Sequence, residues 1–230
     1  MKPGEVLFNL SDLGEIYRGR FVERKNRFIG IVEVEGKEFV CHIADTGRLK
    51  EILIKGREVI LSKNPPSLKT DFKLLACKME QWALINTSVH SKIAEKAIKR
   101  GVLGFVPENV KREVKVGNSR LDFLVDNIYL ELKGSNLLID NHCVFPDAPT
   151  SRGLKHLNEL ISLVENGKKA GILIMALRDC NYFRTNEKLD PEFSSAFKKA
   201  LSKGVRFFGF RVKVSGDYKV VYNGELFLKD

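Results

Sequence analysis

Two acidic residues and a lysine in one short segment have the side chains of a metal-dependent phosphodiesterase site. Asp122 precedes Glu131 by nine residues, and Lys133 follows Glu131 by two. Mg²⁺ prefers oxygen ligands and is commonly held by one or two carboxylates together with phosphate and water. A lysine beside such a metal can orient a water molecule or stabilise negative charge on a phosphate. The three residues therefore predict Mg²⁺- or Mn²⁺-dependent hydrolysis of phosphodiesters.

A β-hairpin would bring the two carboxylates together. If residues 126–127 form a two-residue turn, counting outward along both strands puts Asp122 opposite Glu131. Facing side chains of an antiparallel pair lie about 5 Å apart, and strand alternation puts Tyr129, Glu131 and Lys133 on one face. Two carboxylates so close repel each other unless a cation lies between them or one is protonated. The same residues also fit an exposed hairpin with an ordinary Glu–Lys ion pair.

A helix predicted over residues 88–100 offers a further carboxylate. Its apolar residues recur at helical spacing, and Gly101 is a plausible stop signal. Glu95 lies on this helix and would join the site if the helix packs over the face that carries Glu131. The candidate catalytic residues are therefore Asp122, Glu131, Lys133 and Glu95, and the three carboxylates among them are the candidate metal ligands.

The remaining pattern divides the chain into two domains. Residues 17–84 contain short, closely spaced runs of β-branched or aromatic residues mixed with polar ones, which is typical of a small barrel or sandwich. The pattern then changes to strands alternating with helices, which is typical of an α/β layer. We predict a barrel-like domain over 1–84 and an α/β domain over 85–230. In the second domain the predicted strands are 110–116, 120–125, 128–133, 171–177 and 205–214, and the predicted helices are 88–100, 151–166 and 191–203.

The composition favours an anionic partner. Lys and Arg number 39 against 29 Asp and Glu, which gives a net charge of +10, and phosphate backbones are the commonest partner of such proteins. No apolar run approaches the roughly 20 residues that cross a bilayer, and residues 1–10 lack the apolar stretch of a signal peptide. We therefore expect a cytoplasmic protein without a membrane partner. Its four cysteines include no Cys-x-x-Cys pair, and no disulfide framework is expected.

Basic residues in two regions are candidates for contact with nucleic acid. One group alternates with aromatic residues at the start of the barrel-like region, where we expect Phe28 to belong to the core. The other lies in the first turns of the helix over 151–166, whose N-terminus would attract a phosphate. The same charges would also simply solvate an edge strand and a helix face. The candidates are Arg20, Arg24, Lys25, Arg27, Arg48, Arg152 and Lys155.

The chain resembles the sugar fermentation stimulation protein A family nearly end to end. The resemblance is carried by residues 24–28, 42–49, 114–123, 131–133 and 145–157. A helix with Glu95, then Asp122 and Glu131-Leu-Lys133, is also similar to the PD-(D/E)xK nuclease superfamily, although Leu121 stands where a proline usually precedes the first aspartate. The resemblance implies DNA binding and an α+β (α/β) chain. Its N-terminal OB-like barrel would precede a restriction-endonuclease-like mixed β-sheet flanked by helices.

Three functions remain open from the sequence. The first is a DNA-binding protein with a Mg²⁺-dependent nuclease site. The second is a non-catalytic DNA-binding regulator of sugar (maltose) metabolism genes that keeps the nuclease-like fold as a scaffold, as the family resemblance implies. The third is RNA binding or processing, which fits the same barrel. The sequence leaves the oligomeric state open, with a homodimer among the options.

Overall fold

The computed structural model describes residues 1–117 and 119–229. Asn118, which belongs to the family-like stretch 114–123, lies outside the described residues. The helices are α1 (His90–Lys99), α2 (Ser151–Glu165) and α3 (Pro191–Ser202), with short 3-10 turns η1 (Leu10–Leu13) and η2 (Thr87–Val89). The strands are β1 (Val6–Asn9), β2 (Ile16–Arg24), β3 (Ile29–Val34), β4 (Lys37–His42), β5 (Glu58–Lys63), β6 (Phe72–Lys78), β7 (Trp82–Leu84), β8 (Val110–Val116), β9 (Ser119–Val125), β10 (Ile128–Ser135), β11 (Leu137–Ile139), β12 (His142–Phe145), β13 (Lys169–Ala176), β14 (Tyr182–Thr185), β15 (Arg206–Val214), β16 (Lys219–Glu225) and β17 (Phe227–Leu228).

The five strands β2–β6, called the OB unit below, form a partly open barrel. Their order is β4-β3-β2-β5-β6. β4 meets β6 again only through a short parallel contact, at Cys41↔Phe72 and His42↔Lys73, so the ring of strands is joined at one place and is not closed along its length. Alternate side chains such as Phe21, Val32 and Leu61 fill the interior. Five strands in a partly open barrel are the architecture of an OB-fold.

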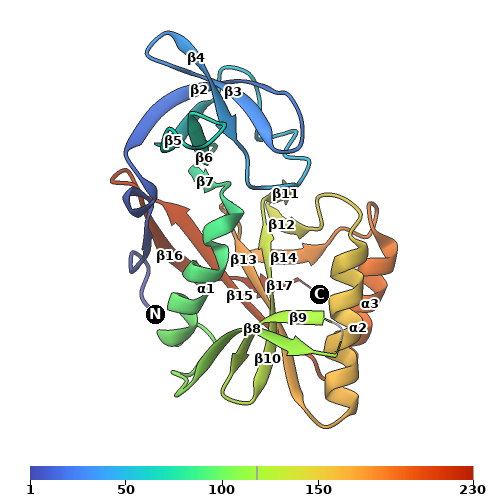
Figure 1. Cartoon of the computed structure of the whole chain (residues 1–230). Coiled ribbons are helices and arrows are strands. Elements are labelled where there is room, and N and C mark those ends of the chain that lie inside the picture. Colours follow the sequence, from blue (N-terminus) through green and yellow to red (C-terminus); the bar gives the residue numbers. More distant parts are fainter. Residues whose placement is uncertain (118, 230) are drawn as a thin grey trace.

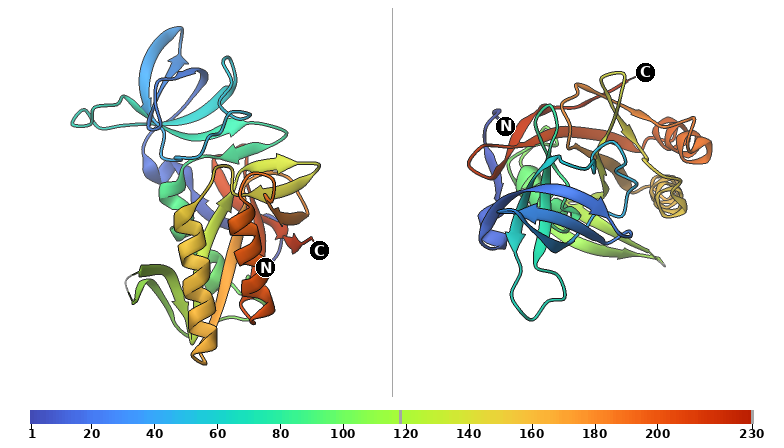
Figure 2. Two further views of the ribbon diagram at one scale, coloured as in Figure 1. Left: turned by 90° about the vertical axis from the view of Figure 1, so that its right-hand side faces the viewer. Right: turned by 90° about the horizontal axis from the view of Figure 1, so that it is seen from above.

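The C-terminal unit, comprising the elements from α1 onward, is built on a mixed sheet with helices on both faces. In the order β15-β13-β10-β9-β8, β13 runs parallel to both β10 and β15, and the other pairs are antiparallel. Figures 1 and 2 show α1 on one side of this sheet and α2 with α3 on the other. Two separate apolar clusters fill these two interfaces. This is the predicted mixed sheet flanked by helices.

Helices α2 and α3 each begin after a residue whose side chain caps the N-terminus of the helix. Thr150 accepts a hydrogen bond from the N–H of Gly153 and caps α2. Asp190 does the same for α3 through the N–H of Phe193, with Pro191 in the first turn. Each helix then turns an apolar stripe toward the sheet. The predicted helix starts at 151 and 191 are therefore confirmed.

The predicted first domain over 1–84 included the N-terminal segment in the barrel. In the structure this segment lies outside the barrel. β1 pairs antiparallel with β16, with Val6 opposite Val221, and so extends the sheet of the C-terminal unit. Residues 72–84 form two strands, β6 and β7, which pair antiparallel. β7 also pairs with β15 through Trp82↔Val214, so one continuous sheet crosses from the OB unit to the C-terminal unit.

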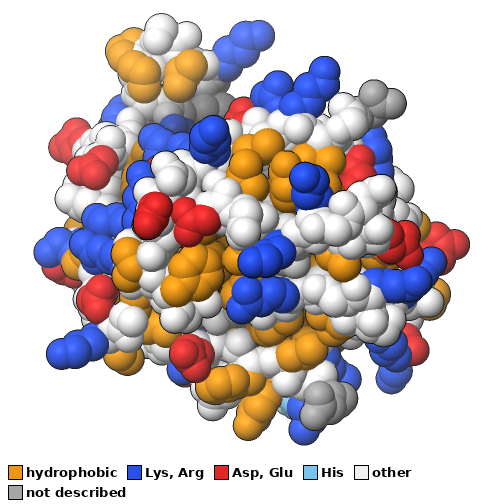
Figure 3. Space-filling model, turned by 90° about the horizontal axis from the view of Figure 1, so that it is seen from below, with side chains coloured by type: hydrophobic (Ala, Val, Ile, Leu, Met, Phe, Trp, Pro, Cys, Tyr) orange, Lys and Arg blue, Asp and Glu red, His pale blue; other side chains and the backbone are white. Residues whose placement is uncertain are grey.

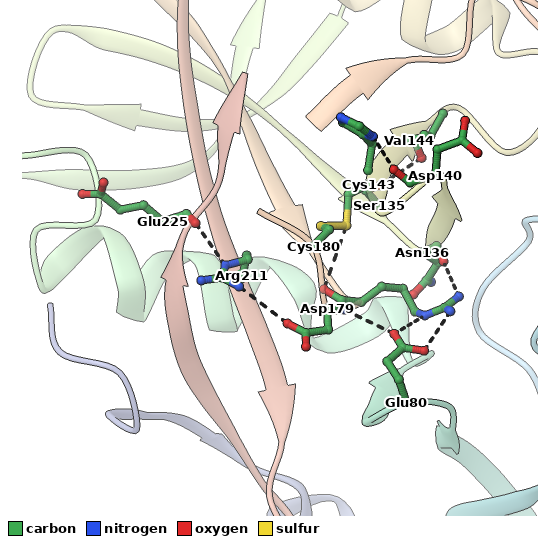
Figure 4. The surroundings of a disulfide bond; sticks show 12 residues. Glu80, Ser135, Asn136, Asp140, Cys143, Val144, Asp179, Cys180, Arg211 and Glu225 are labelled. Atoms are coloured by element: carbon green, nitrogen blue, oxygen red, sulfur yellow. Dashed lines mark hydrogen bonds and ion pairs between the residues drawn. A yellow bond between two sulfur atoms is a disulfide. The ribbon is translucent and has the colours of Figure 1, made fainter. Parts of the chain in front are cut away.

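A disulfide bond joins Cys143 to Cys180, although the sequence predicted no such bond. It ties β12 of a small second sheet, ordered β11-β12-β14-β17, to the turn that follows β13. The two cysteines are 37 positions apart in the sequence, which leaves no local signature of the pairing. Figure 4 shows Glu80 beside this turn, where it accepts two hydrogen bonds from Arg178, at 2.8 Å to Nε and 2.9 Å to Nη2. Because Glu80 lies between β6 and β7, this ion pair fastens the OB unit to the C-terminal unit.

Basic side chains are dispersed over the end of the molecule opposite the OB unit. Figure 3 shows Lys and Arg there with Asp and Glu between them, so the net positive charge is not gathered into one patch on that face. No helix in the described part of the chain combines the length and the apolar character needed to span a membrane.

Candidate active site

The predicted hairpin is formed by β9 and β10. Val125 pairs with Ile128, and the ladder continues to Phe123 opposite Leu130. Asp126 adopts the left-handed conformation, with φ of 49°, and its Oδ1 accepts a hydrogen bond from the N–H of Asn109 at 2.8 Å. The predicted register is therefore confirmed. It directs Asp122 and Glu131 to the face of the sheet that α2 covers.

The Asp122 carboxylate accepts a main-chain hydrogen bond just beyond the last residue pair between β9 and β10. Its Oδ2 accepts a hydrogen bond from the N–H of Leu132 at 2.7 Å. Burial and, secondarily, the negative charge of Glu131 raise the pKa of Asp122 to about 6, while the bond from Leu132 and the positive charge of Lys133 act in the opposite direction. The ionised carboxylate is therefore held at a free-energy cost at neutral pH, which a cation would relieve.

Glu131 is buried and only half satisfied. Its exposed fraction is 3%. Oε1 accepts a hydrogen bond from Lys133 Nζ and also contacts Nδ1 of His156. Oε2 is buried and has no hydrogen-bond partner among the described residues. Burial raises the pKa of Glu131, but the contact with His156 and the positive charge of Lys133 outweigh it, and the pKa is lowered overall. Glu131 is therefore a carboxylate with one free oxygen.

His156 lies in the first turns of the predicted helix over 151–166, beside Arg152 and Lys155, but it was not among the candidate site residues. It lies in α2, is buried, and its Nδ1 is 3.5 Å from Lys133 Nζ in addition to its contact with Glu131. Its neighbours Arg152 and Lys155 are exposed. The available signal was its place at the end of the family-like stretch 145–157, directly before the buried Leu157.

Glu95 is not brought to the other three candidates. The prediction required α1 to pack over the face that carries Glu131, but the apolar side of α1 packs with Leu130 and Leu132, on the opposite face of the sheet. The Glu95 carboxylate is instead paired with Lys99 at 2.6 Å and with Arg112 at 3.6 Å. Helical periodicity identified the buried side of α1, but it could not say which face of the sheet this side would cover.

The acid pair fits a hard divalent cation that keeps several non-protein ligands. The described residues contain no group of three or more His, Cys, Asp and Glu side chains placed to hold a metal ion. Asp122 and the free Oε2 of Glu131 remain as carboxylate donors on one face. Mg²⁺ is usually bound in this way, through one or two carboxylates together with water and substrate phosphate. The residues present would therefore hold Mg²⁺ or Mn²⁺ together with a phosphate.

Arg24 has a structural role that the sequence did not predict. Its guanidinium donates to five main-chain carbonyls, including those of Asp45, Gly47 and Arg48 on the loop after β4. All of its N–H groups are thus directed at the protein, and it holds two loops of the OB unit in place.

The other six basic candidates are exposed on the surface. Arg20 also donates to the carbonyl of Gly56 at 3.0 Å, and Lys25 forms an ion pair with Glu23. These two side chains are therefore partly engaged with the protein. Exposed donors with no such contact are better placed to bind a phosphate, and they are Arg27, Arg48, Arg152 and Lys155.

Phe28 is exposed, although the sequence predicted it in the core. Its exposed fraction is 49%, whereas Phe21 is almost fully buried. Phe28 precedes β3 and lies in a turn in which Asn26 Oδ1 accepts hydrogen bonds from the N–H groups of residues 28 and 29. Strand alternation therefore does not apply to it, and its ring is available on the surface beside Arg27.

The two units define a class of protein. A partly open five-stranded barrel precedes a mixed sheet whose central hairpin carries Asp122, Glu131 and Lys133, which is an OB-fold joined to a restriction-endonuclease-like domain. Family models match the chain in the same order. The model of the SfsA N-terminal OB domain covers residues 22–86, and that of the sugar fermentation stimulation protein RE domain covers residues 88–218. The chain belongs to the sugar fermentation stimulation protein family.

Relatives match over most of their length. A sugar fermentation stimulation protein homolog of Sulfolobus acidocaldarius is 43% identical over 80% of this chain and 77% of its own. A homolog of Saccharolobus solfataricus is 37% identical over 98% of this chain and 90% of its own. The solved structure of Pyrococcus furiosus SfsA in complex with Ca²⁺ is 30% identical, with a TM-score of 0.89, and covers 99% of this chain and 100% of that chain.

Proposed function

We propose that this protein is a divalent-metal-dependent nuclease that hydrolyses phosphodiester bonds of DNA. The observation that carries the proposal is the unsatisfied acid pair. Glu131 Oε2 is buried without a partner among the described residues, and the charge of Glu131 contributes to the raised pKa of Asp122. A buried carboxylate oxygen without a partner costs free energy, and a cation bound between the two carboxylates would remove both costs.

Each residue of the site has a defined role in this proposal. Asp122 and Glu131 hold the cation, which when bound acts as a Lewis acid on the phosphate and lowers the pKa of a coordinated water. Lys133 and His156 both contact Oε1 of Glu131, so they fix the orientation of this carboxylate and leave Oε2 for the cation. Lys133 also places a positive charge beside the acid pair, where it can stabilise the developing charge on a phosphate.

Two comparisons support the proposal. The matching C-terminal family model is named for an RE domain, and the solved relative from Pyrococcus furiosus was obtained in complex with Ca²⁺. Ca²⁺ also takes oxygen ligands, although more of them than Mg²⁺. The exposed side chains of Arg27, Arg48, Arg152 and Lys155 provide positive charge for a phosphate backbone.

The test is calorimetric titration of Mg²⁺ or Mn²⁺, followed by DNA cleavage at the same metal concentration. The proteins are the wild type, an Asp122→Asn/Glu131→Gln double variant, and Glu95→Gln as the matched control. Glu95 is a carboxylate on the opposite face of the sheet, so its variant should retain both properties. We expect metal binding and cleavage to disappear together in the double variant alone.

Other outcomes would identify the rival functions. DNA binding without cleavage, unaffected by metal or by the double variant, would contradict the nuclease and support a regulator built on the same fold. Parallel binding and cleavage measurements with single-stranded DNA, duplex DNA and RNA would show which nucleic acid is the substrate. Cleavage confined to RNA would retain the metal chemistry and change the substrate.

A further inference from the structure

A cleft of about 290 Å³ lies between the OB unit and the C-terminal unit, and its lining includes residues close in sequence to the acid pair. Gly134, the residue after Lys133, forms part of its wall, together with His90 from α1 and Asn136. The opposite wall is the loop of residues 45–47, and residues 145–150 lead from the cleft to α2. Two of the family-like stretches of the sequence, 42–49 and 145–157, therefore meet here.

The walls of this cleft are fixed before any ligand binds. The guanidinium of Arg24 holds the loop of residues 45–48 by donating hydrogen bonds to the main-chain carbonyls of this loop. Across the boundary between the units, Asn136 Nδ2 donates to Asp45 Oδ2 at 2.9 Å, and the N–H of Arg48 donates to Asp147 Oδ2 at 3.0 Å. A rigid wall binds a ligand without a further cost of ordering.

Two buried polar atoms that belong to residues lining the cleft have no partner within the described chain. They are Nε2 of His90, whose exposed fraction is 8%, and Oδ1 of Asn136, at 7%. Burial lowers the pKa of His90 to about 4, so its ring is neutral at pH 7. An unsatisfied buried polar group is unfavourable in the free protein, and a ligand that offers hydrogen bonds to both atoms would remove this cost.

The charges of the cleft select against a phosphate and in favour of a base edge. Asp45 and Asp147 both line it, and negative carboxylates repel a phosphate. Carboxylate and amide oxygens are acceptors for the N–H groups of a nucleobase, as in known contacts of Asp, Glu and Asn with bases. The exposed cation Arg27 also lies on the wall and is available for the adjoining backbone.

We propose that this cleft binds one unpaired nucleobase that carries an exocyclic amino group, in the same strand whose phosphate lies at Asp122 and Glu131. The amino group donates to Asn136 Oδ1 and to the carboxylate side of the cleft, and a ring nitrogen or carbonyl of the base pairs with His90 Nε2. At about 290 Å³ the cleft is at the small end of ligand pockets, which suits one base taken out of a stack. The inference rests on the proposed action on nucleic acid.

The test measures binding of labelled single strands to the full chain in Ca²⁺ without Mg²⁺ or Mn²⁺, with strand integrity checked after each titration. The strands are dC, dA and dT homopolymers and an abasic sugar-phosphate polymer, each of about 12 nucleotides, within the site sizes of OB-folds. The wild type should bind dC or dA at least about tenfold more tightly than the abasic strand, as base contacts of this kind allow. The dT strand, which lacks the amino group, should bind more weakly than dC and dA.

Two variants test the assignment of the cleft. Thr46→Phe fills it from an exposed position, and His90→Phe removes a nitrogen that has no partner in the described chain. Both should lose the preference for dC and dA over the abasic strand and retain abasic binding. Urea unfolding of both variants checks that the fold is retained, because the larger ring of His90→Phe packs against Gly134. Ser195→Phe, on the exposed side of α3, is the matched control and should keep the preference.

The outcomes separate this inference from the proposed function. If the wild type binds and cleaves DNA but both cleft variants keep the base preference, the cleft inference is wrong and the nuclease stands. If the wild type binds the abasic strand as tightly as dC and dA, the inference is equally wrong. If the wild type binds none of the strands and cleaves no nucleic acid, both proposals fail.

Discussion

Replacing Asp122 by asparagine should stabilise the metal-free protein at alkaline pH. The variant keeps an oxygen that can accept the hydrogen bond from Leu132 and removes a charge that is buried beside Glu131. A pKa that rises from 3.8 to about 6 on folding corresponds to about 3 kcal/mol of lost stability for the ionised group. Asp122→Asn should therefore gain on the order of 3 kcal/mol at pH 8 relative to the wild type.

The gain should depend on pH in a defined direction. Below pH 3.8, Asp122 is protonated in the folded and the unfolded chain, so its charge costs nothing. The cost grows as pH rises from 3.8 to about 6, because the unfolded chain releases the proton first, and it is complete above about 6. The advantage of the variant should thus be about 2 kcal/mol larger at pH 8 than at pH 4.

Urea unfolding in EDTA at pH 4 and pH 8 measures this difference. Asp12→Asn, at an exposed position in η1, is the matched control and should show no comparable gain. Added Mg²⁺ should stabilise the wild type and leave Asp122→Asn unchanged, because only a protein that binds the cation in its folded state is stabilised by it. An Asp122→Asn protein that is less stable than the wild type at pH 8, or that gains equally at both pH values, would refute the reasoning.

Three further changes have expected magnitudes. Lys133→Met removes the cation beside the buried Glu131 and should cost about 3 kcal/mol in urea unfolding, because a buried charge loses its partner; a loss under about 1 kcal/mol would mean that water already reaches the site. Arg178→Met breaks the two-bond ion pair with Glu80 and should cost about 2 kcal/mol of unfolding free energy. Lys198→Met, which removes an exposed ion pair with Glu187, is the control and should be nearly neutral. Cys143→Ser should cost about 4 kcal/mol of unfolding free energy, because the disulfide spans a separation of 37 residues. The mass of the wild type should increase by two hydrogens on reduction, and an unchanged mass would contradict the bond.

The local features of the site were predictable because they depend on short-range patterns. Asp126 and Asn127 gave a turn between two alternating runs, and the register that follows from it is the observed one. Alternation then placed Glu131 and Lys133 on the same face without any knowledge of the rest of the fold. The helices α2 and α3 were equally predictable from the sequence, because the cap and the apolar stripe of each helix lie within a few turns of each other.

The features that could not be predicted depend on how distant segments pack. Glu95 was misplaced because periodicity does not reveal which face of the sheet receives α1. The partner of Cys143 lies 37 residues away, and β1 is a four-residue strand whose partner comes more than 200 residues later. Phe28 was misplaced because it lies directly before β3, in a turn held by Asn26, where strand alternation does not apply.

The pairing of β1 with β16 makes the OB unit an insertion within the C-terminal fold. The chain starts in the sheet of the C-terminal unit, leaves it through η1 to build the barrel, and returns through β7 and α1. A module anchored at both ends lacks the hinge freedom of one carried on a single linker. The OB unit is therefore held to the C-terminal unit at both of its ends, and in the proposed nuclease the distance between its loops and the acid pair would stay constant.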